Sequence, residues 1–266
     1  MDTSKIRLDQ VSVEYSPPGS GRWPWKRNNG EAKSRTVLDS ISLEMGEGEF
    51  VSILGHSGCG KSTLLKVVAG FIKPTRGAVW VDGKKIEGPQ GDHVFVFQEG
   101  ALFPWLSIME NTMLSLRRST SGAERRDKAL HYLELVGLEE FANHYPHMLS
   151  GGMRQRAEIA RALGAQPNIL LMDEPFSGLD ALTRLHMREE MLYLQMMMPQ
   201  TTILFVTHDI DEALQLSKRL VIMSEPPSHV KCCRSIDVPH PRTITDSDLK
   251  DTRALIYHHL GVHTAL

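Results

Sequence analysis

The residues around position 60 have the types and the spacing of a loop that binds phosphate. Gly55, Gly58 and Gly60 precede Lys61 and Ser62 in the pattern G-x-x-x-x-G-K-[ST], directly after an apolar run. Because glycine has no side chain, the backbone at these positions can adopt positive φ and approach an anion, so that successive N–H groups point at phosphate oxygens. The pattern predicts a site for a nucleoside triphosphate with magnesium.

Each residue of this loop has a predicted contact with the nucleotide. Residues 63–69 are predicted to form a helix whose N-terminus adds unpaired N–H donors and a partial positive charge. Lys61 is expected to reach the outer phosphates, and the Ser62 hydroxyl to ligate magnesium. The predicted nucleotide contacts in the loop are Gly55, His56, Ser57, Gly58, Cys59, Gly60, Lys61, Ser62 and Thr63.

A pair of adjacent acidic residues is the second candidate for a catalytic or metal-binding role. The apolar run 169–172 ends in Asp173 and Glu174, so a buried strand would deliver two carboxylates to the carboxyl edge of a sheet. Asp173 is expected to hold the magnesium shell, and Glu174 to orient or deprotonate the attacking water. Taken alone, the pair is also compatible with a solvated turn before Pro175.

The elements that must position these groups alternate between strands and helices. Apolar spacing predicts helices over 127–136 and 154–163. Residues 169–172 and 203–206 are unbroken apolar runs, as expected of strands buried on both faces of a parallel sheet. The fold class predicted from this alternation is α/β.

A small β layer is predicted before these elements. Alternating apolar residues indicate short strands at 6–8, 11–13, 41–43 and 79–81. The last of them leads into a hairpin turn at Asp82 and Gly83.

The composition is that of a globular protein with a sizeable core. The chain has 266 residues, of which 41% are hydrophobic and 23% charged, and these suit one large domain or a core with a subdomain. The net charge of −2 gives no indication of nucleic-acid binding. The apolar runs are far shorter than the roughly 18 to 20 residues that span a bilayer, and the first residues lack a secretory apolar region. We therefore expect a cytoplasmic protein.

The three cysteines are Cys59, Cys232 and Cys233, and they form neither a metal-ligand spacing nor a disulfide framework. This pattern is typical of a reducing compartment. Cys59 is interpreted as a small filler within the phosphate loop. The alternative, that the adjoining helix N-terminus lowers its pKa and makes it sensitive to alkylation, stays open here.

Residues 16–36 interrupt the pattern of strands and are predicted to be an exposed loop insertion. The segment is rich in proline, glycine and basic residues, and it contains Trp23 and Trp25. It is either a tolerated surface insertion or a segment whose tryptophans rest on a membrane surface or a partner subunit.

The order of these motifs resembles one family, the ATP-binding cassette (ABC) ATPases. Residues 149–153, Leu-Ser-Gly-Gly-Met, resemble the family signature L-S-G-G-Q. The resemblance implies a phosphate-loop α/β fold with a RecA-like core, an antiparallel β subdomain and an α-helical subdomain. It further implies an ATPase domain over 5–225, with the helical subdomain at about 99–165, and a C-terminal extension over 226–266.

Further site residues follow only from this resemblance. Gln98 is similar to the glutamine of the family's glutamine loop, His208 to its switch histidine, and Tyr15 to the aromatic residue that stacks on adenine. The implied catalytic residues are Glu174, His208, Lys61 and Gln98, and the implied metal ligands are Ser62, Gln98 and Asp173. Additional nucleotide contacts are implied for Tyr15, Ser150, Gly151, Gly152 and Asp180.

The residues alone leave alternatives for two of these assignments. Tyr15 ends a predicted strand and can equally serve in packing. His208 can be the neighbour of a helix cap, since residues 209–212 resemble a capping box. Two departures from the family pattern, Met153 for glutamine and Gly178 for a frequent alanine, are expected to have small effects.

In this family, the signature of one subunit closes over the nucleotide held by the phosphate loop of the other. The resemblance therefore implies a head-to-tail dimer of two copies with two ATP molecules between them. Phe103 and Trp105, soon after Gln98, are placed where the family presents a surface to its membrane-spanning permease subunits. The alternative is that their loop folds onto its own helical subdomain.

Several segments, among them 102–106, 144–148 and 239–242, resemble the importer subgroup for nitrate, sulfonates and taurine. The resemblance implies a peripheral protein on the cytoplasmic face of a bacterial membrane, working with a permease and an extracytoplasmic solute-binding protein that selects the solute. Bicarbonate or a thiamine precursor is the alternative solute. A non-transport ABC ATPase would usually carry two cassettes or a long coiled insertion, and an unrelated kinase or GTPase would leave Ser150 and His208 without roles. A purely structural binding module is disfavoured by Glu174, which can activate water.

Overall fold

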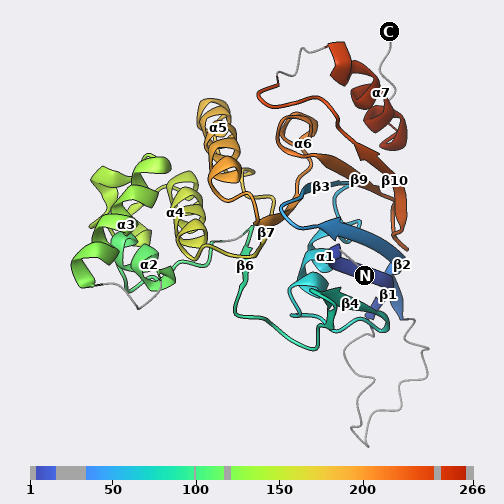
Figure 1. Ribbon diagram of the computed structural model, residues 1–266, viewed down its shortest axis with the longest axis horizontal. Helices are drawn as coiled ribbons and strands as arrows, with labels where there is room; N and C mark the ends of the chain where they lie inside the picture. Colours follow the sequence, from blue (N-terminus) through green and yellow to red (C-terminus); the bar gives the residue numbers. More distant parts are fainter. Residues whose placement is uncertain (1–3, 16–33, 99, 117–120, 243–246, 262–266) are drawn as a thin grey trace, which may run out of the picture.

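The computed structural model describes residues 4–15, 34–98, 100–116, 121–242 and 247–261. Residues 108–116 and 121–164, drawn green to yellow in Figure 1, form a group of helices set to one side of the strands that precede them. The predicted insertion with Trp23 and Trp25 lies outside the described residues.

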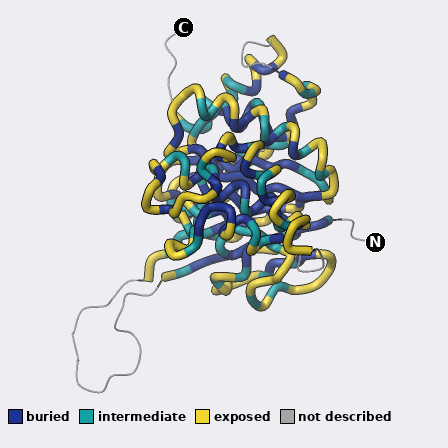
Figure 2. The backbone as a smooth tube through the Cα atoms, turned by 90° about the vertical axis from the view of Figure 1, so that its left-hand side faces the viewer, coloured by how far each residue is buried: buried dark blue, intermediate teal, exposed yellow. Residues whose placement is uncertain are grey.

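A central sheet carries the loops of the candidate site. Among the described residues its strands follow the order β10 (Val230–Ser235), β9 (Arg219–Met223), β3 (Phe50–Leu54), β8 (Thr202–Val206), β7 (Ile169–Asp173) and β6 (His93–Val96). The pairs from β9 to β6 are parallel, and β10 is antiparallel to β9. Every residue of β3, β7 and β8 is buried, which confirms the predicted parallel strands and is visible as the dark blue interior of Figure 2.

A second sheet is antiparallel, in the order β2 (Arg35–Gly46), β1 (Ser4–Tyr15), β4 (Arg76–Val81) and β5 (Lys84–Lys85). The prediction of separate strands at 6–8 and 11–13 was wrong, because both belong to β1. The register to β2 shifts between Leu8 and Val11, and Gln10 there has a φ of 48°. The predicted hairpin turn at Asp82 and Gly83 is confirmed, with φ values of 48° and 71° that suit a tight hairpin.

The start of β2 corrects one boundary of the predicted insertion. Arg35 and Thr36, which the sequence assigns to the insertion 16–36, are the first residues of the strand. They pair with Tyr15 and Glu14 at the end of β1. The strand predicted at 41–43 is an interior part of β2.

The described residues contain the α-helices α1 (Lys61–Val68), α2 (Ile108–Ser115), α3 (Gly122–Leu135), α4 (Gly151–Gly164), α5 (Ala181–Met197), α6 (Ile210–Leu216) and α7 (Lys250–His259). Short 3₁₀ turns lie at Glu139–Phe141, Pro146–Met148 and Ser247–Leu249. The predicted helices at 63–69, 127–136 and 154–163 correspond to α1, α3 and α4. Each begins earlier than predicted, because α3 and α4 start after the capping serines Ser121 and Ser150, and α1 starts after Gly60.

The C-terminal segment is folded onto the central sheet. Ile256 of α7 packs in one apolar cluster with Leu214 of α6 and Ile222 of β9. Arg253 Nη2 lies 2.9 Å from Asp211 Oδ1, so α7 is also tied to α6 by an ion pair. Figure 1 shows α7 beside β10. Within the described residues, no helix combines the length and the apolar character needed to cross a membrane.

Candidate functional site

The phosphate loop between β3 and α1 is held by its own lysine. Lys61 is buried, and its Nζ donates to Gly55 O at 2.8 Å and His56 O at 3.1 Å. Gly58 and Gly60 have φ values of 76° and 100°, which an L side chain rarely adopts. A Cβ on Gly60 would also lie 2.9 Å from the Val37 and Leu38 side chains of β2. These two glycines are therefore required by backbone conformation, as predicted.

Gly55, the remaining glycine of the loop, is required for a different reason. The prediction of positive φ was wrong for Gly55, because it is not among the residues with positive φ. A Cβ at Gly55 would instead lie 2.7 Å from Cys59 Sγ. Cys59 is fully buried in the apolar cluster around α1, and burial raises the pKa of its thiol. The structure thus favours Cys59 as a filler that packs tightly against Gly55.

The two predicted magnesium ligands Ser62 and Asp173 lie side by side. Ser62 Oγ donates to Asp173 Oδ1 at 2.9 Å. Burial raises the pKa of the Asp173 carboxyl, and the hydrogen bond from Ser62 opposes that effect. Gln98 lines the same cavity as Ser62. A hydroxyl, a carboxylate and an amide oxygen are hard donors, so this set fits a magnesium ion.

Glu174 follows β7 in a left-handed conformation with a φ of 47°, which costs a non-glycine residue about 1–2 kcal/mol. Its backbone is held from several sides: its N–H donates to Val206 O at 3.0 Å, and its carbonyl accepts from Ser177 Oγ at 2.9 Å and from Gln155 Nε2 at 3.3 Å. Its Oε2 lies 3.0 Å from His208 Nδ1. Strained backbone of this kind is common at catalytic positions.

Both interpretations of His208 are compatible with its surroundings, because it directly precedes a helix cap and also contacts Glu174. Asp209 is the N-cap of α6, and its Oδ1 accepts from Asp211 N and Glu212 N. Asp209 also receives Arg184 and Arg188 from α5, both at 3.2 Å. Capping is thus performed by Asp209, while the His208 ring contacts the Glu174 carboxylate.

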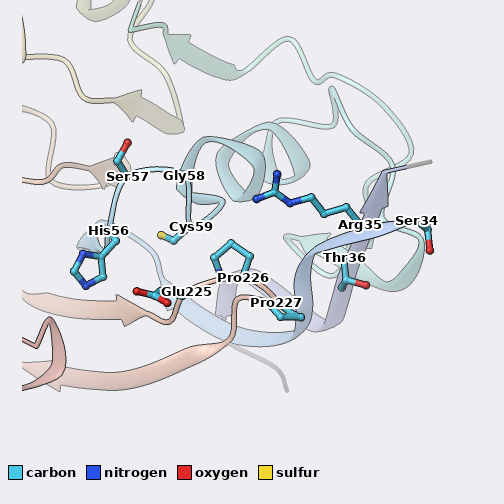
Figure 3. Close-up of a pocket in the computed structure, with 10 residues that line it drawn as sticks. All are labelled: Ser34, Arg35, Thr36, His56, Ser57, Gly58, Cys59, Glu225, Pro226 and Pro227. Atoms are coloured by element: carbon cyan, nitrogen blue, oxygen red, sulfur yellow. The ribbon is translucent and has the colours of Figure 1, made fainter. Parts of the chain in front are cut away.

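Two adjoining cavities border the phosphate loop and share Arg35, Ser57 and Gly58. The first, of about 450 Å³, brings together Lys61, Ser62, Thr63, Gln98 and Glu174. The second, of about 610 Å³ and shown in Figure 3, lies between the loop, the start of β2 and the segment after β9. It is lined by Ser34, Arg35, Thr36, His56, Ser57, Gly58, Cys59, Glu225, Pro226 and Pro227.

Arg35 is a site residue that the sequence pattern does not reveal, because it stands among the basic residues of the predicted insertion. In Figure 3 its side chain extends from β2 toward the phosphate loop. Tyr15, the predicted adenine contact, is its register partner at the end of β1 and is 44% exposed. Tyr15 does not line either of the two cavities in the described part of the chain.

The signature segment forms the N-terminus of α4 and lies outside both cavities. Ser150 is the N-cap, and its Oγ accepts from Met153 N at 3.2 Å. A Cβ on Gly152 would lie 3.2 Å from Leu179 Cδ2 and 3.3 Å from Gly178 O. As far as the described residues extend, Ser150, Gly151 and Gly152 line neither cavity beside the phosphate loop. The chain therefore presents two separate glycine-rich helix N-termini.

Comparison with known proteins identifies this arrangement. A family model described as ABC transporter matches residues 38–177, more than half of the chain. The chain belongs to the ABC transporter family. A putative ATP-binding protein of Brucella abortus is 45% identical over 208 residues, which are 78% of this chain and 80% of the relative.

A second relative in this family is the aliphatic sulfonates import ATP-binding protein SsuB of Bacillus cereus (strain ATCC 10987 / NRS 248). It is 43% identical over 223 residues, covering 84% of this chain and 88% of that protein. A solved dimeric ATP-binding cassette bound to ADP and Pi has a TM-score of 0.74 and 34% identity, covering 88% of this chain and 100% of its own. The predicted fold is thereby confirmed, and the chain is an ATP-binding transport ATPase of the ABC transporter family.

Residues 177–180, Ser-Gly-Leu-Asp, resemble the D-loop of the ABC family and are attached to α4, the helix that follows the signature. Gly178 N donates to Gln155 Oε1 at 3.2 Å, and a Cβ on Gly178 would lie 2.9 Å from the same oxygen. This contact gives a physical reason for glycine where the family often has alanine. Asp180 is the N-cap of α5, and its hydrogen bonds from Thr183 lower the pKa of its carboxyl.

The aromatic loop after β6 exposes both predicted partner contacts. Phe103 is 41% exposed and Trp105 is 70% exposed, with ring centroids 5.4 Å apart. The loop is anchored by buried Asn111 of α2, whose Oδ1 accepts from Phe103 N at 2.8 Å and whose Nδ2 donates to Leu106 O at 3.1 Å. Phe103 also lies under Arg161, with 5.8 Å from the Arg161 Cζ to the ring centroid. The loop is thus attached to the helical subdomain, as the alternative interpretation expects, but the Trp105 side chain stays exposed and accessible to a partner.

Cys59 is expected to resist thiol reagents in the folded protein, because it is fully buried and its thiol is held protonated. Cys233 is exposed and provides an internal comparison. Carbamidomethylation by iodoacetamide at pH 8, followed by peptide mass spectrometry, should be at least about tenfold slower at Cys59 than at Cys233. Labelling in denaturant should remove the difference. Equal rates in the native protein would contradict the burial of Cys59.

Proposed function

We propose that this chain is the ATP-hydrolysing subunit of an importer for a small anion, of the aliphatic sulfonate class, and that ATP-driven closure of a dimer energises transport. The observation that carries the hydrolytic part is the 3.0 Å contact between Glu174 Oε2 and His208 Nδ1, at the cavity that holds Lys61 and Ser62. The likeness to aliphatic sulfonates import proteins over 84%, 82% and 83% of the chain supports the solute class.

In the proposed mechanism, one set of protein groups binds the phosphates of ATP and another set orients and deprotonates the attacking water. The Lys61 ammonium and the N–H groups of the loop bind the outer phosphates of ATP. The Glu174 carboxylate accepts the proton of the attacking water, and His208 orients that carboxylate and contacts the γ-phosphate. Gln98, which lines the same cavity, helps to orient that water. Magnesium, when bound, neutralises phosphate charge, and Ser62, Gln98 and Asp173 would hold it.

The second half of each site would come from another copy of the chain. Ser150, Gly151 and Gly152 form a helix N-terminus that is suited to anions, and the cavities of their own chain do not include them. The dimeric form of the solved cassette supports a head-to-tail dimer. Asp180 is held near the signature because Gly178 N donates to Gln155 of α4, and it would contact the nucleotide across this interface. Tyr15 would stack on the adenine ring.

We infer that Phe103 and Trp105 contact a membrane-spanning permease. A cavity of about 400 Å³ is lined by Phe103, Leu114 and Arg161 among others, and its mostly apolar walls suit an inserted apolar segment of a partner. The protein would sit on the cytoplasmic face of the membrane, and an extracytoplasmic solute-binding protein would select the solute. The proposed division is an ATPase domain over 5–225 with helical subdomain 99–165, an insertion over 16–34 and extension 226–266.

Substitution of the proposed base should separate ATP binding from hydrolysis. Glu174→Gln keeps the size of the side chain but its amide cannot accept a proton, so phosphate release should fall by about 100-fold or more. ATP affinity, measured by isothermal titration calorimetry, should change by less than about twofold. Lys61→Ala serves as the contrasting variant and should lose affinity itself. Turnover of Glu174→Gln near that of the wild type would remove Glu174 from the role of base.

Substitution of the signature serine should block hydrolysis without weakening ATP binding by the monomer. Ser150→Arg places a large cation at the helix N-terminus and should reduce phosphate release by about 100-fold. Ser121→Arg is the matched control, because Ser121 is also a helix-capping serine and lies at α3 away from the signature. Normal hydrolysis by Ser150→Arg would contradict a shared site.

The solute class can be tested by uptake in a strain that lacks the gene. Wild-type protein should restore uptake of a labelled alkanesulfonate, and Glu174→Gln should not, because import depends on hydrolysis. Labelled nitrate and taurine are measured in the same cells. Restored uptake of nitrate alone would contradict the sulfonate assignment and leave the ATPase assignment intact.

A further inference from the structure

One buried carboxylate of α4 has no part in the functions considered so far. Glu158 is 1% exposed and lies two turns beyond the signature serine. Its Oε1 accepts from Phe97 N at 3.1 Å, and its Oε2 accepts from Ala101 N at 2.9 Å. The two backbone donors flank Gln98, so a single side chain spans the base of the glutamine loop.

Arg161, one turn further along α4, holds the same loop from a second direction. Its Nη1 donates to Ala101 O at 2.9 Å, and its guanidinium lies 5.8 Å from the Phe103 ring. Ala101 is thus bonded to α4 through both its N–H and its carbonyl. These contacts attach α4 to Phe97 directly before Gln98, to Ala101 and to Phe103 of the exposed aromatic loop.

The hydrogen bonds of the buried Glu158 carboxylate hold the loop firmly against α4. In the described part of the chain, Glu158 accepts hydrogen bonds from these two backbone N–H groups, and they and the nearby Arg161 charge oppose the burial that raises the pKa of its carboxyl. A buried carboxylate that loses such charge-assisted bonds is left desolvated and without its donors, which is strongly unfavourable. The loop and α4 are therefore expected to move together when either is displaced.

We propose that Glu158, assisted by Arg161, is a positioning residue that fixes the Gln98 loop to the signature helix. Through it, a displacement of α4 at the partner's nucleotide, or of the Phe103 loop at a docked permease, changes the position of Gln98. This inference rests on the proposed function, which assigns Gln98 to the hydrolytic site and the N-terminus of α4 to the dimer interface. Glu158 itself touches neither ATP nor water.

The test is a double-mutant cycle on ATP hydrolysis. Glu158→Gln replaces one acceptor by an amide donor that faces a backbone N–H, and should lower kcat by about tenfold while KM for ATP changes by less than about twofold. In a Gln98→Ala background the same substitution should lower kcat by less than about twofold, because Glu158 acts through Gln98. Equal losses in both backgrounds, or no loss in the first, would overturn the proposal.

Two further variants and an independent measurement complete the design. Glu134→Gln, an exposed glutamate of α3, is the control and should behave as the wild type. Arg161→Gln, which leaves the carboxylate in place, should reproduce the direction of the effect if Glu158→Gln does not fold. Amide hydrogen exchange of Phe97 and Ala101 needs no hydrolysis and should quicken by about tenfold in Glu158→Gln. Unchanged exchange would overturn the proposal, whereas a wild type without ATPase activity would contradict the proposed function instead.

Discussion

The hydrogen bond from Ser62 Oγ to Asp173 Oδ1 joins the first turn of α1 to the end of β7, and the other groups of the site are placed relative to it. Asp173 pairs in register with Val206 of β8, and the N–H of Glu174 donates to the carbonyl of that same residue. The strands that bury Asp173 therefore also set the backbone of Glu174 and the start of the segment that carries His208. A shift of β8 against β7 would disturb all of these groups together.

The parts of the site that could be predicted are those in which the chemistry is local. Lys61 and Ser62 follow glycines within one loop, and Asp173 and Glu174 follow one buried strand, so short spacing was sufficient to find them. Gly55 shows the limit of this reasoning. A glycine can be required because the backbone has positive φ or because a neighbouring atom leaves no room for a Cβ. At Gly55 the position of Cys59 Sγ shows that close packing is the reason.

Residues contributed by distant segments could not be found in this way. Arg35 reaches the loop only because β2 pairs with β1, and Glu225 only because the chain turns between β9 and β10. The helix α5 was missed because its apolar residues lie on both faces, with Met187 buried and Leu182 and Met196 exposed. The two strands predicted within β1 were separated by a bulge at Gln10, which interrupts the alternation without ending the strand.

The antiparallel strand β10 ends the central sheet beside β9 and carries the charged residues Lys231 and Arg234, both exposed, with Lys231 Nζ donating to His259 O at the end of α7. Charged residues on a terminal strand discourage the addition of a further strand from another molecule, because its backbone would have to approach and desolvate them. Copies of this protein are thereby discouraged from joining through continuous β-structure. The proposed dimer would instead form through surfaces built from helix ends and loops, where contact can be made and broken repeatedly.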